Sequence, residues 1–571
     1  MSYNPRIKNI SGGTVDISGS LAATNVSTYV SASNANIATV VANSISASTV
    51  DSGTSLDITL KSVKSSIRKV TSGTSIQTTD SIILVDAASG SVGLTLPSAS
   101  LVPGQRFTVK KVDSTGNIAV LLGSSTNITS SFFETAILSG GYAVDSGDNY
   151  GWSVALSGIG NRLIVGAPFD EIGGTSTGII YLYVYSSGSW IQEMAQRTSL
   201  PSDNANIGRS VSINRSGSMF VAGASGLSSG GRAFVYQSGS SGWSESIILL
   251  GSLAISDIND LFGWSVATNA QGNRLVVGAP QDERVSATAS TGLAYVFDSG
   301  SGGWTQTVIL SGTLATQVDD WFGYSVAMNA DGDRVVVGAS QDERSGGGSA
   351  GGLAYIFISG SGTGWRQNTI LSGTLANDAS DWFGYSVAMN SAGDRVVVGA
   401  VQDERTGGSA SSGLAYVFTS GSNGWIQELI SSGTLAVDSN DNFGYRVSIN
   451  SAGDRFVVGA YKDEKPGQTD SGLAYLYTSG SNGWTQTAIL SGSNAVNNSD
   501  QFGSSVAMND TGDMIAVGAM SDEINSSVSN AGTVYVFSPV QPIDSIGNKS
   551  LFSQNESVTV ISDGTGSWSI I

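Results

Sequence analysis

Pairs of adjacent acidic residues are the first candidates for chemistry in this 571-residue chain. Two neighbouring carboxylates can act as the acid and the base of a glycosidase. A catalytic pair is singular, however, whereas this pair recurs six times, often with an arginine close by. The pattern predicts repeated salt bridges or loop hydrogen bonds, and we expect no catalytic residues and no enzyme. The six pairs are Asp170-Glu171, Asp282-Glu283, Asp342-Glu343, Asp403-Glu404, Asp463-Glu464 and Asp522-Glu523.

The composition excludes most other kinds of catalytic site. The chain has no Cys and no His, which removes thiolate nucleophiles, the commonest general base and the commonest metal ligand. Its formal net charge is −19, and such a surface repels the phosphate backbone of nucleic acids. No run of about 18 apolar residues is present, and the first six residues do not resemble a secretory signal. We therefore expect no cofactor, no nucleic-acid partner and no membrane span.

The strongest signal in the sequence is a unit of about 60 residues that recurs seven times. Each copy opens with a Gly, usually after Phe, and carries a Gly-Ala pair 15 residues later. Because this interval never changes, we expect a tightly packed hairpin between the two glycines. The opening residues are Gly151, Gly208, Phe262-Gly263, Phe322-Gly323, Phe383-Gly384, Phe443-Gly444 and Phe502-Gly503, and the later glycines are Gly166, Gly223, Gly278, Gly338, Gly399, Gly459 and Gly518.

The fifth copy displays the strands of one unit. Residues 383–389 alternate as a strand does, residues 390–394 suit a turn that contains Gly, and residues 395–400 suit a second, buried strand. A variable Gly/Ser loop leads to a third strand at 414–418, and a fourth follows at 425–430. Four antiparallel strands in each copy predict one blade of a β-propeller.

Aromatic residues recur on the third and fourth strands, as Tyr416, Phe418 and Trp425 do in the fifth copy. A binding ladder is the functional alternative, but specialised sites do not recur in every blade, so we interpret these residues as packing between blades. The seventh copy lacks its fourth strand, and residues 132–140 match the fourth strand of the sixth copy at 484–492. We therefore predict that the segment before the first blade supplies the outer strand of the last, which closes a seven-bladed ring.

The Phe-Gly opening and the later Gly-Ala(-Pro) element, as at residues 278–280, resemble the FG-GAP repeat of integrin α-subunit heads. The Trp strand and the Ala-Tyr-Val-Phe strand resemble more closely the variant of bacterial and viral surface proteins. The resemblance covers residues 130–540 and implies a propeller whose loops offer a binding face. Integrin-type blades hold calcium in an EF-hand-like loop, but with Gly332 at its centre two of the required oxygens are missing, at Ala327 and Val335. We therefore interpret these segments as hairpin turns and predict no metal site.

Departures from the repeat provide the candidate ligand contacts. Trp321 and Trp382 stand just before Phe-Gly in the fourth and fifth copies, in loops between blades. The second copy lacks the acidic pair and has arginines of its own, among them Arg209 and Arg232. Aromatic rings and guanidinium groups on a loop face suit a sugar or a protein surface. The alternative for the two tryptophans is that they brace the loops.

The two ends of the chain differ in composition from the repeats. Residues 1–70 are rich in Ser, Thr, Ala and Asn and resemble viral fibre shafts, which implies an anchoring arm or stalk of β structure, with a short helix as the alternative. Residues 71–125, with predicted strands at 81–86, 92–97, 106–112 and 117–122, resemble a module of phage and large-virus fibre proteins. The end of such a module resembles residues 545–571, so we predict a neck built from 71–125 plus 545–571.

The sequence thus predicts an all-β protein in which a seven-bladed β-propeller is inserted in a small β module, with an extended N-terminal β arm or stalk. The fibre-like ends favour a structural fibre or spike of the virion surface that forms a homotrimer. Its arm is expected to bind other virion or capsid proteins, and its propeller face a host surface protein or glycan. The alternatives are a microbial cell-surface or extracellular adhesin or filament subunit, and a polysaccharide-active enzyme.

Overall fold

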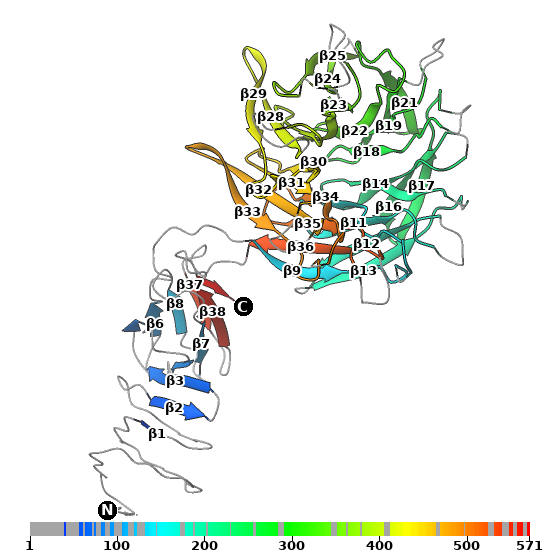
Figure 1. The fold of residues 1–571 in the computed structure, drawn as a ribbon. Helices are drawn as coiled ribbons and strands as arrows, with labels where there is room; N and C mark the ends of the chain where they lie inside the picture. The colour runs from blue at the N-terminus through cyan, green and yellow to red at the C-terminus, as the bar shows by residue number, and fades with distance from the viewer. Residues whose placement is uncertain are drawn as a thin grey trace, which may run out of the picture. The chain divides into compact units, whose positions relative to one another are not determined.

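The computed structural model describes residues 132–539 apart from short loop segments, together with the backbone of strands β1–β8 and β37–β39. No helix occurs in the described part of the chain (Figure 1), and in that part no helix long and apolar enough to cross a membrane is found. The structure is therefore all-β, as predicted. The loop residues outside the description are 144, 172–176, 187–188, 201, 203, 229, 255–258, 284–290, 344–350, 361–363, 377, 379, 405–411, 464–468, 496 and 524–529.

Seven sheets of four strands each form the blades of a propeller (Figure 1). Successive strands of blades 1 to 6 pair antiparallel, and the first strands of neighbouring blades contact one another around the whole ring, so they lie nearest the axis. The predicted seven-bladed ring is confirmed. Blades 1 to 3 comprise β10 (Ser153–Leu156), β11 (Arg162–Ala167), β12 (Ile179–Ser186), β13 (Ser189–Gln196); β14 (Ile207–Ile213), β15 (Met219–Ala224), β16 (Arg232–Gly239), β17 (Gly242–Leu249); and β18 (Ser265–Thr268), β19 (Arg274–Ala279), β20 (Leu293–Gly300), β21 (Gly303–Leu310). Blades 4 to 6 comprise β22 (Phe322–Met328), β23 (Arg334–Ala339), β24 (Leu353–Gly360), β25 (Gly364–Leu371); β26 (Phe383–Met389), β27 (Arg395–Ala400), β28 (Leu414–Gly421), β29 (Gly424–Ser431); and β30 (Phe443–Ile449), β31 (Arg455–Ala460), β32 (Leu473–Gly480), β33 (Gly483–Leu490).

Blade 7 is assembled from both ends of the propeller segment. Its strands follow the order β34 (Phe502–Met508), β35 (Ile515–Ala519), β36 (Thr533–Pro539) and β9 (Phe132–Leu138). The hydroxyl of Thr135 on β9 donates a hydrogen bond to the carbonyl oxygen of Val536 on β36, at 3.1 Å. The predicted donation of the outer strand by the segment before blade 1 is confirmed, and β9 covers the edge of β36 that would otherwise be open.

A second unit contains residues 1–131 and 539–571. One of its sheets has the order β1-β2-β3-β5-β7-β38-β39 and the other the order β37-β8-β6-β4. In both sheets a strand that precedes the propeller pairs with one that follows it, β7 with β38 and β8 with β37, so the propeller is an insertion. Outside β1–β3, the arm predicted over residues 1–70 lies outside the described residues. The strands are β1 (Thr39–Val40), β2 (Leu56–Leu60), β3 (Val63–Val70), β4 (Thr74–Ser75), β5 (Ile82–Val85), β6 (Val92–Thr95), β7 (Arg106–Lys111), β8 (Ala119–Leu122), β37 (Asn548–Leu551), β38 (Ser557–Ser562) and β39 (Trp568–Ile570).

The two glycines of each repeat meet at the interface between neighbouring blades. A Cβ atom added to Gly399 of blade 5 would lie 2.0 Å from the carbonyl oxygen of Gly444 in blade 6. Gly444 itself has a φ of 91°, which residues with a side chain rarely adopt. The same approach recurs at the other six interfaces, in the pairs Gly166–Gly208, Gly223–Gly263, Gly278–Gly323, Gly338–Gly384, Gly459–Gly503 and Gly518–Gly151. These glycines let the blades come into backbone contact.

Hydrogen bonds join each blade to the next. Ser386 donates its hydroxyl to the carbonyl oxygen of Gly444 at 2.7 Å, and Arg395 donates Nη1 to that of Gly453 at 2.7 Å. Equivalent serines bond across five other interfaces, from Ser153, Ser210, Ser265, Ser325 and Ser505. Blade 6 is the exception, because Arg446 stands where the other blades have this serine.

The hairpin turns between first and second strands form a closed ring of main-chain hydrogen bonds. One N–H from each blade reaches a carbonyl oxygen of the next blade at N···O distances of 2.9–3.3 Å. Within a turn, the Asn390 carboxamide oxygen accepts from the backbone N–H groups of Asp394 and Arg395. The turn oxygens are thus used internally, as expected of hairpin turns. The ring runs Ile159→Arg215, Arg215→Ala270, Ala270→Ala330, Ala330→Ser391, Ser391→Ser451, Ser451→Asp510 and Asp510→Gly158.

The core lies between blades rather than within one blade. Phe322 of blade 4 packs edge-on against Tyr355 and Phe357, with ring centroids 5.3 and 6.0 Å apart. The cluster around these rings includes Val276 and Val296 of blade 3, which are fully buried. The aromatic residues of the third strands are therefore packing residues, as predicted.

The glycine contact predicts a large effect of one added methyl group. We expect Gly399→Ala to destabilise the propeller by about 3 kcal/mol, because its Cβ would overlap a backbone oxygen that cannot move alone. Denaturant unfolding followed by tryptophan fluorescence measures the change. Gly421→Ala is the matched control, since a Cβ there meets nothing within 4 Å. Equal stability of the two variants would contradict the assigned role of the glycine pair.

Candidate functional site

One side chain from each of six consecutive blades meets its neighbours around the propeller axis. These residues follow the opening Gly of their repeats, on or just before the inner strands, and we call them the axial ring: Trp152, Arg209, Trp264, Tyr324, Tyr385 and Tyr445. Their contacts run from blade to blade, with centroid distances of 5.4 Å for Trp264–Tyr324, 4.8 Å for Tyr324–Tyr385 and 5.2 Å for Tyr385–Tyr445. Residues at one repeat position touch in this way only where the strands converge on the axis. All but Tyr385 are partly exposed.

Two guanidinium groups are stacked into this aromatic surface. Arg209 lies 3.6 Å from the ring centroid of Trp264 and 5.0 Å from that of Trp152. Arg446 lies 4.6 Å from the ring centroid of Tyr445 and also contacts Tyr385. Burial lowers the pKa of Arg209, yet a guanidinium stays protonated in proteins. Within the described part of the chain neither arginine forms an ion pair, so the positive charge of the ring is not neutralised by a carboxylate.

Three of the four predicted ligand contacts join this cluster. Arg209 belongs to the axial ring, Trp321 stacks on Tyr324 and Trp382 stacks on Tyr385, with interplanar angles of 9° and 7°. Both tryptophans thus stack against residues of the axial ring. Arg232 is different, because it begins β16, the third strand of its blade, and donates to the carbonyl oxygen of Gly231 at 2.6 Å.

The propeller face that carries the hairpin turns, opposite the axial ring, has a polar hollow of about 380 Å³. Its charged groups are already used within the protein. Arg215 pairs with Asp510 at 2.5 Å, and Arg455 donates to the carbonyl oxygen of Gly512 at 3.1 Å. We therefore take the axial ring as the candidate ligand site of the propeller.

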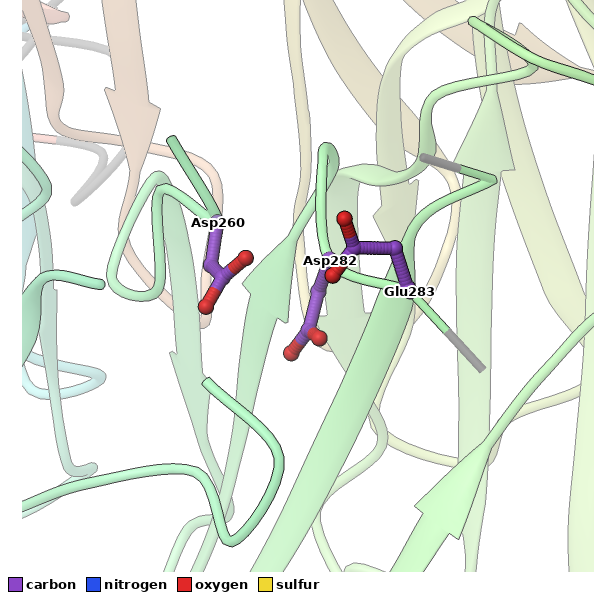
Figure 2. A group of neighbouring side chains, drawn as sticks. All are labelled: Asp260, Asp282 and Glu283. Atoms are coloured by element: carbon purple, nitrogen blue, oxygen red, sulfur yellow. The ribbon is translucent and has the colours of Figure 1, made fainter. Parts of the chain in front are cut away.

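Acidic side chains gather at a second kind of site, between the inter-blade loop and the loop that follows the second strand. In blade 3, Asp260, Asp282 and Glu283 point toward one another (Figure 2), and a carboxylate oxygen from each lies within 4.8 Å of the others. The turn after β19 positions Asp282, whose N–H donates to the carbonyl oxygen of Ala279 at 3.2 Å. Equivalent clusters are Asp320–Asp342–Glu343 and Asp381–Asp403–Glu404. Each cluster unites a predicted acidic pair with an aspartate 22 residues earlier in the sequence.

The aspartate of each pair accepts a hydrogen bond from a buried tyrosine. The Tyr416 hydroxyl donates to Oδ2 of Asp403 at 2.5 Å, and the same bond occurs in blades 1, 3, 4, 6 and 7. Burial, with the charges of Asp381 and Glu404, raises the pKa of Asp403 to about 7. Of the two structural roles that the sequence predicted, the hydrogen bond is present. Arg284, Arg344 and Arg405, the predicted salt-bridge partners, lie outside the described residues.

Blade 2 has lost this arrangement as a unit. At the positions of Asp381, Asp403 and Glu404 it carries Ala205, Leu227 and Ser228, and at the position of Tyr416 it carries Phe234. The apolar replacements Ala205, Leu227 and Phe234 are buried in one hydrophobic cluster. An apolar core thus takes the place of the acidic network in this blade.

The contrast between blades 2 and 5 predicts a double-mutant result. We expect Tyr416→Phe to cost about 2 kcal/mol, because it leaves Oδ2 of the buried Asp403 without its donor. Adding Asp403→Leu, as in blade 2, should recover most of that loss, since both polar groups are then gone. Denaturant unfolding of the two single variants and the double variant gives the coupling energy. Additive losses would show that the two side chains act independently.

Six segments of the chain match the model of the FG-GAP repeat: residues 143–183, 256–297, 304–357, 374–418, 436–477 and 484–537. The interval 184–255, which contains the strands of the divergent blade 2, is unmatched. No curated protein matches the chain significantly. The repeat pairs of glycines, the seven blades and the matched segments agree, and the propeller of this chain belongs to the FG-GAP repeat family.

Proposed function

We propose that this protein is a surface fibre or spike of a virus particle, and that its propeller is the head that binds a host surface protein or glycan. The observation that carries the binding role is the axial ring, where Arg209 and Arg446 stand among aromatic side chains without a carboxylate partner in the described structure. A chain with a net charge of −19 repels anionic surfaces in general. A local pair of cations therefore favours a ligand that presents a carboxylate or another anionic group at this one place.

Aromatic side chains suit the same ligand class. Their faces supply large apolar contact area at low entropic cost, and their polarised rings bind the C–H faces of sugars and the side chains of proteins. The stacking of Trp321 on Tyr324 and of Trp382 on Tyr385 holds two of the three ring tyrosines in place. A preformed surface of this kind loses little freedom on binding.

The rest of the chain supports a role in anchoring the head. The propeller is joined to the second unit by two chain crossings, one on each side of the insertion. Two crossings constrain a head more than a single flexible linker does. In this proposal the fibre-like N-terminal arm binds other virion or capsid proteins, the assembly is a homotrimer, and the propeller faces outward from the virion surface.

Loss of one guanidinium tests the binding role. We expect the full chain to bind acidic oligosaccharides on a glycan array, or intact host cells, and Arg209→Gln to weaken that binding at least tenfold. The matched control is Arg366→Gln, which removes an exposed guanidinium from the outer strand β25 of blade 4 and should leave the apparent Kd unchanged. Equal binding by both variants and the unmodified protein would reject the axial ring as the ligand site.

The homotrimer is tested by mass in solution. Light scattering on the purified full chain should give about three times the 58.3 kDa of one chain, because a sparsely apolar arm gains burial only by pairing with copies of itself. A monomeric mass at the highest concentration measured would contradict the self-assembling fibre and would favour the adhesin alternative.

A further inference from the structure

We propose that the three acidic clusters of blades 3, 4 and 5 are calcium sites. Each cluster contains two buried aspartates and one partly exposed glutamate, so carboxylate oxygens converge from two loops while one side of the site stays open to solvent. These sites lie at the ends of the inner strands that are farthest from the hairpin turns. Calcium loops of the integrin type would be expected in the hairpin turns instead. They are independent of the ligand proposed for the axial ring.

A second observation, separate from the clustering of charge, points to a missing ligand. Asp342 and Asp403 are almost fully buried, at 0% and 1% exposure. Each uses Oδ2 to accept a hydrogen bond from a tyrosine, Tyr355 or Tyr416. The other oxygen, Oδ1, of both residues has no hydrogen-bond partner within the described structure. A buried carboxylate oxygen without a partner is costly, and a bound cation would satisfy it.

The charge of the cluster leads to the same conclusion. Three carboxylates within 4.8 Å of one another repel strongly when two of them are buried. Burial and this repulsion both destabilise the charged carboxylates. One divalent cation offsets both effects at neutral pH.

The chemistry of the donors selects calcium among the common cations. Every donor is a carboxylate oxygen, which hard cations prefer, and the chain has no Cys or His to favour zinc. The donors come from loops rather than from a rigid octahedral cage. Calcium accepts six to eight oxygens in irregular geometry, including bidentate carboxylates and water, whereas magnesium requires near-ideal octahedral coordination.

Comparison among the blades separates this proposal from a purely structural role. A buried Tyr–Asp hydrogen bond requires only two residues, yet blade 2 has lost the tyrosine and all three acidic positions together. Loss of the whole set is expected if the residues serve one bound ion, because the remaining carboxylates would only repel each other. The same residue types recur in blade 1 as Asp148, Asp170 and Glu171, and in blade 7 as Asp500, Asp522 and Glu523, so these blades are further candidates.

Titration with calcium alone tests the proposal on the full chain. After removal of cations with a chelator, isothermal titration calorimetry should show at least three bound ions per chain, and about 1 mM calcium should raise the melting temperature. The triple variant Glu283→Gln, Glu343→Gln and Glu404→Gln should bind three ions fewer, or bind them at least tenfold more weakly. It keeps every Tyr–Asp hydrogen bond, so its melting temperature in chelator should not fall below that of the unmodified protein.

Asp331→Asn is the matched control, because it removes one exposed carboxylate from a hairpin turn outside the clusters. It should retain the full number of calcium ions. The proposal is overturned if the unmodified chain binds no calcium, or if the triple variant binds the same number of ions with the same affinity. A magnesium titration that matches calcium in number and affinity would overturn the choice of ion.

Discussion

Backbone contact between glycines of neighbouring blades is the constraint on which the propeller depends. At each interface the carbonyl oxygen of one glycine occupies the space that a Cβ on the facing glycine would need. This contact sets the distance between inner strands, and the other links between blades require that distance. The serine hydroxyls, the second-strand arginines and the ring of turn hydrogen bonds all span short gaps that a single methyl group would widen.

The fold could be predicted from the sequence because its determinants repeat. The glycine pair recurs with a constant spacing, the aromatics of the third strand recur in every copy, and residues 132–140 match the fourth strand of the sixth copy. The axial ring was missed because its position holds Trp, Arg, Tyr or Ser in different blades. The six side chains meet at the axis only because the seven blades close into a circle, and no single repeat reveals that closure.

The acidic clusters show another limit of sequence reasoning. Adjacent carboxylates such as Asp342-Glu343 are visible as a pair, but the third member, Asp320, lies 22 residues earlier and meets them only in the folded blade. The constant interval was the available signal. The buried Asp342 accepts a hydrogen bond from the hydroxyl of Tyr355, a partner 13 residues later that the sequence pattern did not single out.

The exchange of strand β9 has a mechanical consequence. The chain enters the propeller at β9 and leaves it after β36, and these strands are neighbours in blade 7. Tension between the two units therefore passes through one blade, and the load path bypasses the inner strands of the other six. Arg209, Trp264 and Tyr324 belong to blades 2 to 4, outside that path. A pull on the second unit would strain blade 7 before it distorted the surface that these three residues form.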